Sequence, residues 1–498
     1  MLRRIKNFTR KFQTEILVKN DIKSMDMMPG PRGFLGLGNV FNYTKPFGKY
    51  SWLDLHKSGM DKYRKYGSIV CERMVPGFSI VWLYDPNDIA QIFNDGIGNF
   101  PCRRSHLALQ KYRQDRPETY RSGGILPTNG QEWWKLRSEF QKGLSSPQNV
   151  RNLLPQTDDM VREFISVLPS RFDNDCTIQD FVSELERLSL ELTCLIAFDQ
   201  RMNSFAEEER DPNSRTSRLI KASDNSNDAV LPTDQGLQLW RFFETPTYKK
   251  LRKAQEYKEK IVIEFIQKKA YQKDKGNSLL DQYLNNPNIN VKDIVGMSAD
   301  LLLGGIHTTS FSTSFAMYHI ARNERIQNLL HEEAMKVLPT FDDKVTTQVM
   351  NSEIPYTRAV LKETFRLNPV SIGVGRILNH DTILGGYLVP KDTTVVTQNF
   401  VACRLEENFS DPLTFLPERW LKTNHQKSNI HPYLVIPFGH GMRSCIARRL
   451  AEQAILTVVL RILRDYKLEW KGCEELDIST RLINRPKSDV TIKFIKRN

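Results

Sequence analysis

The feature that most constrains this chain is residues 437–449, which read Pro-Phe-Gly-His-Gly-Met-Arg-Ser-Cys-Ile-Ala-Arg-Arg. Gly439 and Gly441 allow the backbone to turn tightly, and a long helical pattern begins directly after Cys445. A helix N-terminus offers backbone N–H groups to a sulfur and lowers the pKa of a thiol. The spacing therefore predicts a stable thiolate at Cys445. An inert, buried cysteine beside a glycine turn is the alternative.

The composition describes a folded globular chain with an acidic partner. The 498 residues are 40% hydrophobic and 26% charged, and the length suits one large domain or two to three ordinary ones. The net charge of +13 favours an anionic membrane surface or an acidic protein as the partner. No domain-sized basic block with interleaved aromatic residues occurs, so nucleic acid is not expected. The seven scattered cysteines argue against a disulfide framework or a structural zinc site and indicate a reducing compartment.

The first 12 residues are basic and amphipathic. Their Lys and Arg side chains alternate with apolar residues at helical spacing, and no acid precedes Glu15. This pattern is typical of a mitochondrial transit peptide, and we predict residues 1–28 as that leader. A basic solvated tail or a membrane-surface helix is the alternative. A spanning helix needs roughly 20 apolar residues, and no such run is present here.

Residues 29–498 are expected to form a single α+β domain, mainly helical, with a small β-sheet region. The pattern from about residue 149 to residue 335 is mostly helical, and a last helix is expected over residues 447–466. The expected strands are residues 68–73, 80–83, 376–378, 387–389 and 393–397, with turns at Pro76-Gly77 and Gly385-Gly386.

The full spacing F-x-x-G-x-R-x-C-x-A in residues 438–447 resembles the cytochrome P450 family. The resemblance implies that Cys445 ligates the iron of haem b, that Phe438 shields the sulfur, and that Arg443 pairs with a haem propionate. In such haem proteins a thiolate ligand favours cleavage of the O–O bond. Ala447 stands where the family more often has glycine, and it is still small enough for close approach to the porphyrin.

Further motifs agree with this family. Glu363 and Arg366 are three residues apart and share a helical face. By themselves they could form an exposed ion pair of little value. A downstream Pro-Glu-Arg-Trp segment carries Arg419 at the family spacing, and the resemblance implies that these three charges lock the cysteine side of the haem. The resemblance also assigns contacts to the haem propionates to Trp133, Arg137 and Arg376.

Residues 301–321 contain no Asp, Glu, Lys or Arg. The pair Gly304-Gly305 and a Ser/Thr cluster make this segment too polar for a membrane span, so we expect a long buried helix. The resemblance implies that the glycines make room for oxygen and that Thr308 handles oxygen and protons. His307 departs from the family, which usually has an acid directly before this threonine. An imidazole can also carry protons, and a neutral, inactive ring is the alternative.

Arg358 and Lys362 are four residues apart and share a helical face beside that of Glu363, so one stripe can face inward while the other faces solvent. Ordinary surface charge is the alternative. Mitochondrial members of the family carry basic residues here to dock an acidic, adrenodoxin-like [2Fe-2S] ferredoxin, which is reduced by its own reductase. Arg448 and Arg449 extend the basic surface, and electrostatic steering suits a short-lived complex with an acidic electron carrier.

Composition does not name a substrate, but three segments narrow the choice. Residues 105–109, 231–241 and 394–399 resemble the insect mitochondrial ecdysteroid 22-hydroxylases of this family. The resemblance implies that the chain uses molecular oxygen to hydroxylate a steroid at C22, for moulting-hormone synthesis on the matrix side of the inner mitochondrial membrane. An apolar and aromatic cluster at residues 232–243 is expected either as core packing or as a lip that contacts the membrane.

Two other functions stay open at this point. A mitochondrial monooxygenase of foreign lipophilic compounds would use the same scaffold. A haem-containing sterol-binding protein with impaired turnover is the second, and it is motivated by His307.

Overall fold

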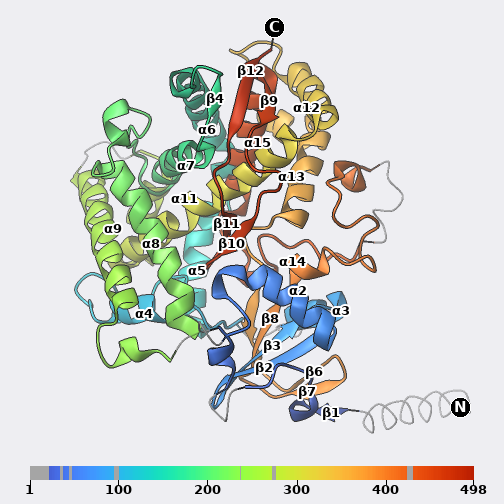
Figure 1. Cartoon of the computed structure of the whole chain (residues 1–498). Coiled ribbons are helices and arrows are strands. Elements are labelled where there is room, and N and C mark those ends of the chain that lie inside the picture. Colours follow the sequence, from blue (N-terminus) through green and yellow to red (C-terminus); the bar gives the residue numbers. More distant parts are fainter. Residues whose placement is uncertain are drawn as a thin grey trace, which may run out of the picture.

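In the computed structural model a large helical part lies beside a smaller part in which α2 and α3 flank short strands (Figure 1). Residues 1–21, which hold most of the expected leader, lie outside the described residues. The structure describes residues 22–33, 38–43, 48–94, 100–235, 237–271, 276–422 and 430–497.

Helices dominate the chain, as the periodic spacing of apolar residues predicts. Several begin at a capping side chain: Ser146, Asp180 and Asn290 each accept a hydrogen bond from a backbone N–H of the first turn. The α-helices are α2 (Leu55–Tyr66), α3 (Pro86–Asn94), α4 (Leu107–Gln114), α5 (Gly130–Leu144), α6 (Pro147–Val167), α7 (Phe181–Phe198), α8 (Arg215–Gln235), α9 (Pro246–Tyr271), α10 (Leu279–Leu284), α11 (Val291–Ala321), α12 (Glu324–Val337), α13 (Pro355–Leu367), α14 (Asn399–Ala402) and α15 (Arg448–Asp465).

Helix α11 lies at the centre of the helical part and packs against α7, α8, α9, α13 and α15 (Figure 1). Of its 31 residues, 23 are buried, which confirms the expected long buried helix. Burial also accounts for the absence of charged residues from position 301 to position 321. Gly305 allows a close approach to α7, since a Cβ at this position would lie 2.7 Å from Oγ1 of Thr193. Among the described residues no helix has the length and apolar character needed to cross a membrane.

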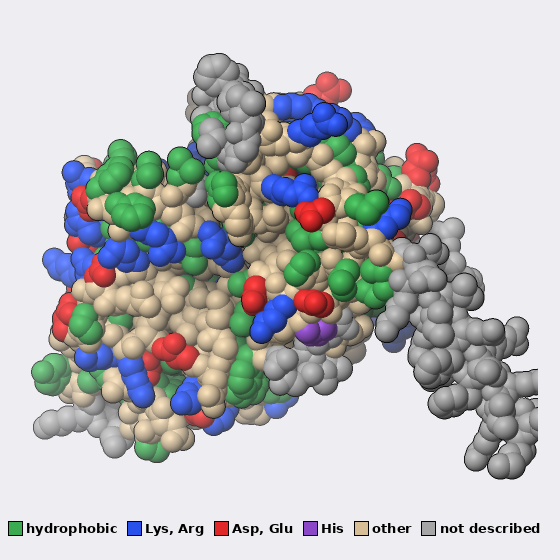
Figure 2. Space-filling view, turned by 90° about the horizontal axis from the view of Figure 1, so that it is seen from below, with side chains coloured by type: hydrophobic (Ala, Val, Ile, Leu, Met, Phe, Trp, Pro, Cys, Tyr) green, Lys and Arg blue, Asp and Glu red, His purple; other side chains and the backbone are tan. Residues whose placement is uncertain are grey.

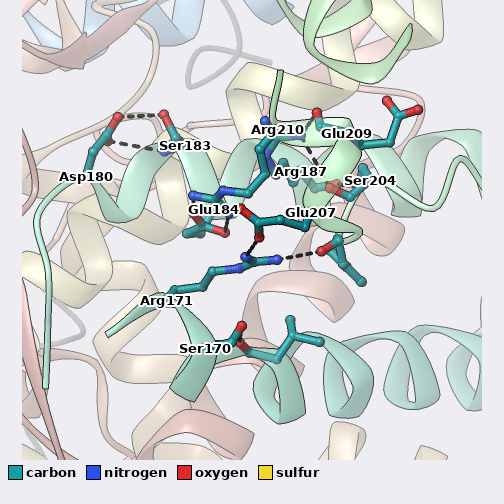
Figure 3. A network of polar contacts seen from close by, with 12 residues as sticks. Ser170, Arg171, Asp180, Ser183, Glu184, Arg187, Ser204, Glu207, Glu209 and Arg210 are labelled. Atoms are coloured by element: carbon teal, nitrogen blue, oxygen red, sulfur yellow. Dashed lines mark hydrogen bonds and ion pairs between the residues drawn. The ribbon is translucent and has the colours of Figure 1, made fainter. Parts of the chain in front are cut away.

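A network of charged groups fixes α7 against the loop that leads to α8 (Figure 3). Arg210 donates to the Glu184 carboxylate at 2.7 Å, and Arg187 donates to the backbone carbonyl of Glu209 at 2.9 Å. These contacts occupy one face of α7 and leave another face to pack against α11.

In the part of the chain that the structure describes, the strands form four small sheets. In the largest, β2 and β3 form the expected hairpin, β8 runs parallel to β3, and β5 runs antiparallel to β8. The expected turns at Pro76-Gly77 and Gly385-Gly386 connect β2 to β3 and β6 to β7. The strands are β1 (Lys23–Ser24), β2 (Ile69–Val75), β3 (Phe78–Leu83), β4 (Thr177–Ile178), β5 (Gly375–Ile377), β6 (Thr382–Leu384), β7 (Tyr387–Val389), β8 (Thr394–Thr397), β9 (Tyr466–Trp470), β10 (Ile478–Thr480), β11 (Asn484–Pro486) and β12 (Ile492–Lys496).

Strands β4 and β9 to β12 are not among those that the sequence pattern predicts. They are short, and β12 pairs both with β9 and with β4, which lies about 300 residues earlier in the chain. Such strands depend on distant partners more than on local propensity. The helix expected over residues 447–466 is confirmed as α15, with its start and end shifted by one residue each.

Candidate active site

The segment before α15 folds into a tight loop that presents Cys445. The amide of Cys445 donates to the carbonyl of Phe438 at 2.8 Å and closes the loop. Gly439 and Gly441 have φ angles of +69° and +74°, a region that residues with a side chain rarely adopt. The ring of Phe438 packs edge-on against Phe365 of α13, with 5.3 Å between the ring centroids, and this contact fixes the loop against that helix.

The expected lowering of the Cys445 pKa is wrong for the protein alone. Burial raises the pKa of this thiol, and the backbone N–H of Ala447 and the charge of Arg137 oppose that effect only in part. The helix N-terminus is too far away to dominate, because α15 begins at Arg448. Cys445 is nevertheless exposed although burial desolvates its thiol, so the residue lies in a recess that a ligand can reach. A metal ion bound there would deprotonate the thiol outright.

Four arginine side chains surround this recess: Arg103, Arg137, Arg376 and Arg443. Burial and the charges of the other three lower the pKa of Arg443 to about 8. Burial and the charge of Arg103 lower the pKa of Arg376 to about 10. Within the described residues the hydrogen bonds of all four guanidinium groups go to neutral acceptors. The recess therefore holds an excess of buried positive charge.

Arg443 is the most constrained member of the cluster. It donates to the carbonyl of Thr128 and to Oδ1 of Asn129, each at 2.6 Å, and to the carbonyl of Pro101 at 2.8 Å. Its guanidinium lies 4.7 Å from the ring centroid of Trp133, which is buried. Its Nε is buried without a partner among the described residues. This arrangement fixes the guanidinium and leaves its charge uncompensated.

Two other arginines contact the cysteine loop directly. Arg137 of α5 donates to the carbonyl of Ser444 at 2.7 Å, and Arg376 of β5 approaches the carbonyl of His440 at 3.4 Å. The pKa of Arg137 is also lowered by burial. The structure thus brings the predicted residues from α5, β5 and the loop before α15 to one place.

Haem fits these residues. Buried cations without a counter-charge are costly, and they need an anionic partner. Haem carries two propionates, and guanidinium groups bind carboxylates with paired, charge-assisted hydrogen bonds. A thiolate can ligate its iron, and Cys445 is the exposed cysteine in the recess. The donors therefore match both ends of the group: Cys445 for the iron, and the arginine cluster for the propionates.

The three charges predicted beside the haem form one buried network. Arg366 donates to both oxygens of Glu363, at 2.8 Å each, and both side chains are fully buried. Nε of Arg419 lies 3.4 Å from Oε1 of Glu363. Glu363 also accepts from Nε1 of Trp420 and from the amide of Leu416, each at 2.9 Å. The alternative of an exposed ion pair is wrong.

On α11, Gly304 and Thr308 present one turn of the helix to open space. Gly304 is exposed although the helix is central, and a Cβ placed there would meet no atom within 4 Å. The hydroxyl of Thr308, one turn later on the same face, donates to the Gly304 carbonyl at 2.5 Å. Gly305 faces Thr193 of α7 instead. The predicted glycine pair is therefore divided between open space and helix packing.

His307 lies against α7. Its side chain is 1% exposed, and its Nδ1 is 3.1 Å from Oε1 of Glu186. The imidazole stacks on Phe311, with 5.4 Å between the ring centroids. The residue in the position of the family's usual acid is thus held beside an acid from another helix.

Arg358, Lys362, Arg448 and Arg449 are all exposed, and we term these four residues the basic face. Lys362 also lies over the ring of Trp420, with its Nζ 4.1 Å from the centroid. The predicted division of α13 into a buried and an exposed stripe is confirmed. Arg448 lies over the Phe438 ring, which packs on α13, and so the start of α15 continues this face.

Sequence reasoning missed Arg103 and Glu186. Arg103 donates to the carbonyl of Leu126 at 2.8 Å and is buried within the arginine cluster. Neither residue belongs to a recognisable motif. The only signal for Arg103 is a pair of arginines next to an apolar access segment, and Glu186 carries no signal of its own.

Comparisons with known proteins agree with this geometry. The sequence pattern of the family "Cytochrome P450" matches residues 28–494. The chain is 52% identical to "Cytochrome P450 302a1, mitochondrial" of Drosophila melanogaster, over 94% of this chain and 95% of that protein. It is 30% identical to "Probable cytochrome P450 12b2, mitochondrial" of the same organism, over 95% and 89% of the two chains. It is 26% identical to the "Ecdysone 20-monooxygenase" of that organism, over 94% and 88%. This chain belongs to the cytochrome P450 family of haem-thiolate monooxygenases.

Proposed function

We propose that this protein is a mitochondrial steroid hydroxylase that oxidises C22 of an ecdysteroid precursor. The observation that carries the proposal is the 52% identity with a relative named as mitochondrial, which extends over 94% of the chain and not only over the haem motifs. A further relative is named for oxidation of an ecdysteroid. The segments similar to ecdysteroid 22-hydroxylases favour C22 as the position. A monooxygenase consumes O2, two electrons and two protons, and it yields the alcohol and one water.

The cysteine side of the site holds the cofactor. Haem supplies the oxidising chemistry when it is bound. Cys445 would bind its iron, and Phe438 would shield the sulfur from water. Arg443, Arg376 and Arg137 would neutralise the propionates, because burial leaves these guanidinium groups in need of an anionic partner.

The opposite side of the site receives oxygen and substrate. Gly304 leaves the space next to α11 open, because it has no side chain to fill it. Thr308 places a hydroxyl at the same turn, and a hydroxyl can both donate and accept a proton. His307 lies next to it and is the nearest titratable side chain along the helix.

Electrons come from an acidic [2Fe-2S] ferredoxin that docks on the basic face. Long-range attraction speeds the encounter of such partners and weakens with salt. Exchange of Arg358 and Lys362 for Gln should raise the KM for ferredoxin about tenfold and leave the KM for steroid unchanged. Lys336→Gln on α12 removes another exposed charge outside this face and serves as the control. An equal effect of the control would contradict docking at the basic face.

We assign residues 1–28 to a mitochondrial leader and residues 29–498 to one catalytic domain on the matrix side of the inner membrane. Membrane contact is supported by an apolar loop between α8 and α9. Trp240 in this loop is core, as one alternative predicts, whereas Phe242 is 84% exposed and Phe243 is 59% exposed. The lower face of the molecule shows hydrophobic side chains interspersed with basic ones (Figure 2).

The membrane contact can be measured with vesicles of phosphatidylcholine and cardiolipin. Exchange of Phe242 and Phe243 for Ser should abolish most co-sedimentation with these vesicles, because exposed aromatic side chains supply the buried apolar area. Exchange of Phe341, an exposed phenylalanine outside the loop, is the control. Unchanged co-sedimentation of the double variant would exclude the loop as the contact.

The first test of the whole proposal is the carbon monoxide difference spectrum of the reduced protein, with Cys445→Ala beside it. A thiolate-type Soret band that is absent from the variant is expected. Reconstitution with ferredoxin, its reductase and NADPH should then convert ecdysteroid precursors to 22-hydroxylated products. Turnover of foreign lipophiles alone would favour the xenobiotic alternative. Steroid binding without product would favour the sterol-binding alternative.

A further inference from the structure

A buried histidine and a partly exposed glutamate connect the solvent to the centre of α11. His307 lies directly before Thr308, and its Nδ1 is 3.1 Å from Oε1 of Glu186 on α7. The histidine side chain is 1% exposed and the glutamate side chain is 19% exposed. A carboxylate accepts but does not donate, so Nδ1 carries a proton in this contact. The contact therefore links a group that touches water to a group that does not.

The other ring nitrogen of His307 has a different environment. Nε2 is buried and has no hydrogen-bond partner among the described residues. Stacking on Phe311 restricts the ring. In an imidazole the hydrogen bond at one nitrogen sets the protonation of the other, so the contact with Glu186 governs the protonation of Nε2.

The charges that face His307 come from three elements besides its own. Glu186 lies on α7, Asp224 lies on α8, and Arg485 of β11 donates to Asp224 at 2.8 Å. Burial would raise the pKa of Asp224, but the neighbouring His307, Arg485 and Lys221 lower it below its usual value. Asp224 thus shares its charge with two cations, whereas Glu186 has its described contact with His307 alone.

We propose that Glu186 is a positioning residue that orients His307 and supplies it with protons from solvent, so that this pair takes over the part of the acid usual before the threonine. The inference rests on the proposed monooxygenase function and deepens it. The acid has not been lost from the site. It stands on α7 and contacts the imidazole that directly precedes Thr308 in the chain.

The proton balance of this relay is simple. A doubly protonated His307, stabilised by the Glu186 carboxylate, releases the proton on Nε2 toward the Thr308 side and keeps the proton on Nδ1. The released proton is one of the two that a hydroxylation consumes, and water replaces it on the pair through the partly exposed carboxyl of Glu186. The electrons come from the ferredoxin.

The relay is tested with Glu186→Gln, which keeps the size of the side chain and removes the proton-carrying carboxyl. The fraction of NADPH electrons that appear in product should fall about tenfold or more, with the rest appearing as hydrogen peroxide. The KM for steroid should not change. Glu186→Asp should restore most of the coupling. Glu184→Gln, on another face of the same helix, is the matched control, because Glu184 pairs with Arg210.

A second readout does not depend on turnover. In the diamagnetic, carbon monoxide-bound protein with 15N-labelled histidine, the His307 signals are assigned by their loss in His307→Asn. The Nδ1 proton should be strongly deshielded in the native protein and in Glu184→Gln, and shifted upfield in Glu186→Gln. An unshifted Nδ1 signal would mean that the contact does not form.

The outcomes separate the relay from the function on which it rests. If the native protein lacks a thiolate-type band or forms no product, the proposed function fails. If the native protein hydroxylates steroid and Glu186→Gln couples as well as Glu184→Gln does, only the relay fails. The relay also fails if Glu186→Gln lowers coupling equally in a His307→Ala background, because Glu186 would then act without the imidazole.

Discussion

Two groups of buried arginines differ in how their charge is balanced. Arg366 and Arg419 meet the carboxylate of Glu363, and they also donate to backbone carbonyls and, from Arg419, to the hydroxyl of Ser410. Arg443 and Arg376 also donate to neutral acceptors, but no carboxylate joins their described contacts. In the first group a carboxylate of the protein balances the buried charge. In the second group the charge is balanced only when an anion binds.

The balance of buried charge distinguishes a structural network from a binding site. A buried charge that the protein itself neutralises stabilises a particular packing of elements, here α13 against the segment around Trp420. A buried charge that the protein leaves unbalanced is unfavourable until a ligand arrives, and its pKa is displaced accordingly.

The largest effect is expected from Glu363→Gln. The exchange leaves two arginine charges buried without a counter-charge, and it should lower the free energy of unfolding by about 3–5 kcal/mol. Urea unfolding of the haem-loaded protein, with the thiolate-type band as a second signal, measures the change. Arg448→Gln, which breaks an exposed pair with Glu452, should cost less than about 1 kcal/mol. If both variants lost the same free energy of unfolding, the buried Glu363 network would contribute no more to stability than a surface ion pair.

The second experiment tests the unbalanced group. Native apoprotein should bind haem about 10- to 100-fold more tightly than haem dimethyl ester, because the ester lacks propionate charges. Arg443→Met should remove most of that preference without lowering the free energy of unfolding of the apoprotein, since a repulsive charge is lost. Titration of apoprotein with the two porphyrins measures both affinities. A preference that survives the exchange would show that Arg443 does not bind a propionate.

The smallest effect is expected from Arg103→Gln. Burial lowers the pKa of Arg103, but Asp300 and Asp234 lie close enough to oppose the shift, so part of its charge is already compensated. The preference for haem over its ester should therefore fall less than about tenfold. The same titration measures it. If Arg103→Gln reduced the preference for haem as much as Arg443→Met does, the arginines would contribute equally to propionate binding.

The sequence predicted most of the site because its motifs are local. The loop around Cys445 needs glycine at two positions with positive φ, and the two stripes of α13 follow from helical spacing. The strands after α15 were not predicted, because β12 pairs with β9 and with the distant β4. For the loop between α8 and α9 the sequence pattern allows either core packing or membrane contact. The structure shows both environments, because Trp240 is buried while Phe242 is exposed.

By itself the sequence determined the cysteine loop, the uncharged central helix and the family. These are properties of neighbouring residues, and backbone conformation and helical period act over a few positions. Only the tertiary structure decided that the pKa of Cys445 is raised, since desolvation depends on what surrounds the sulfur. Only the tertiary structure placed Glu186 beside His307, 121 residues away in sequence. The packing of α7 on α11 brings these two side chains together, and no pattern of neighbouring residues predicts it.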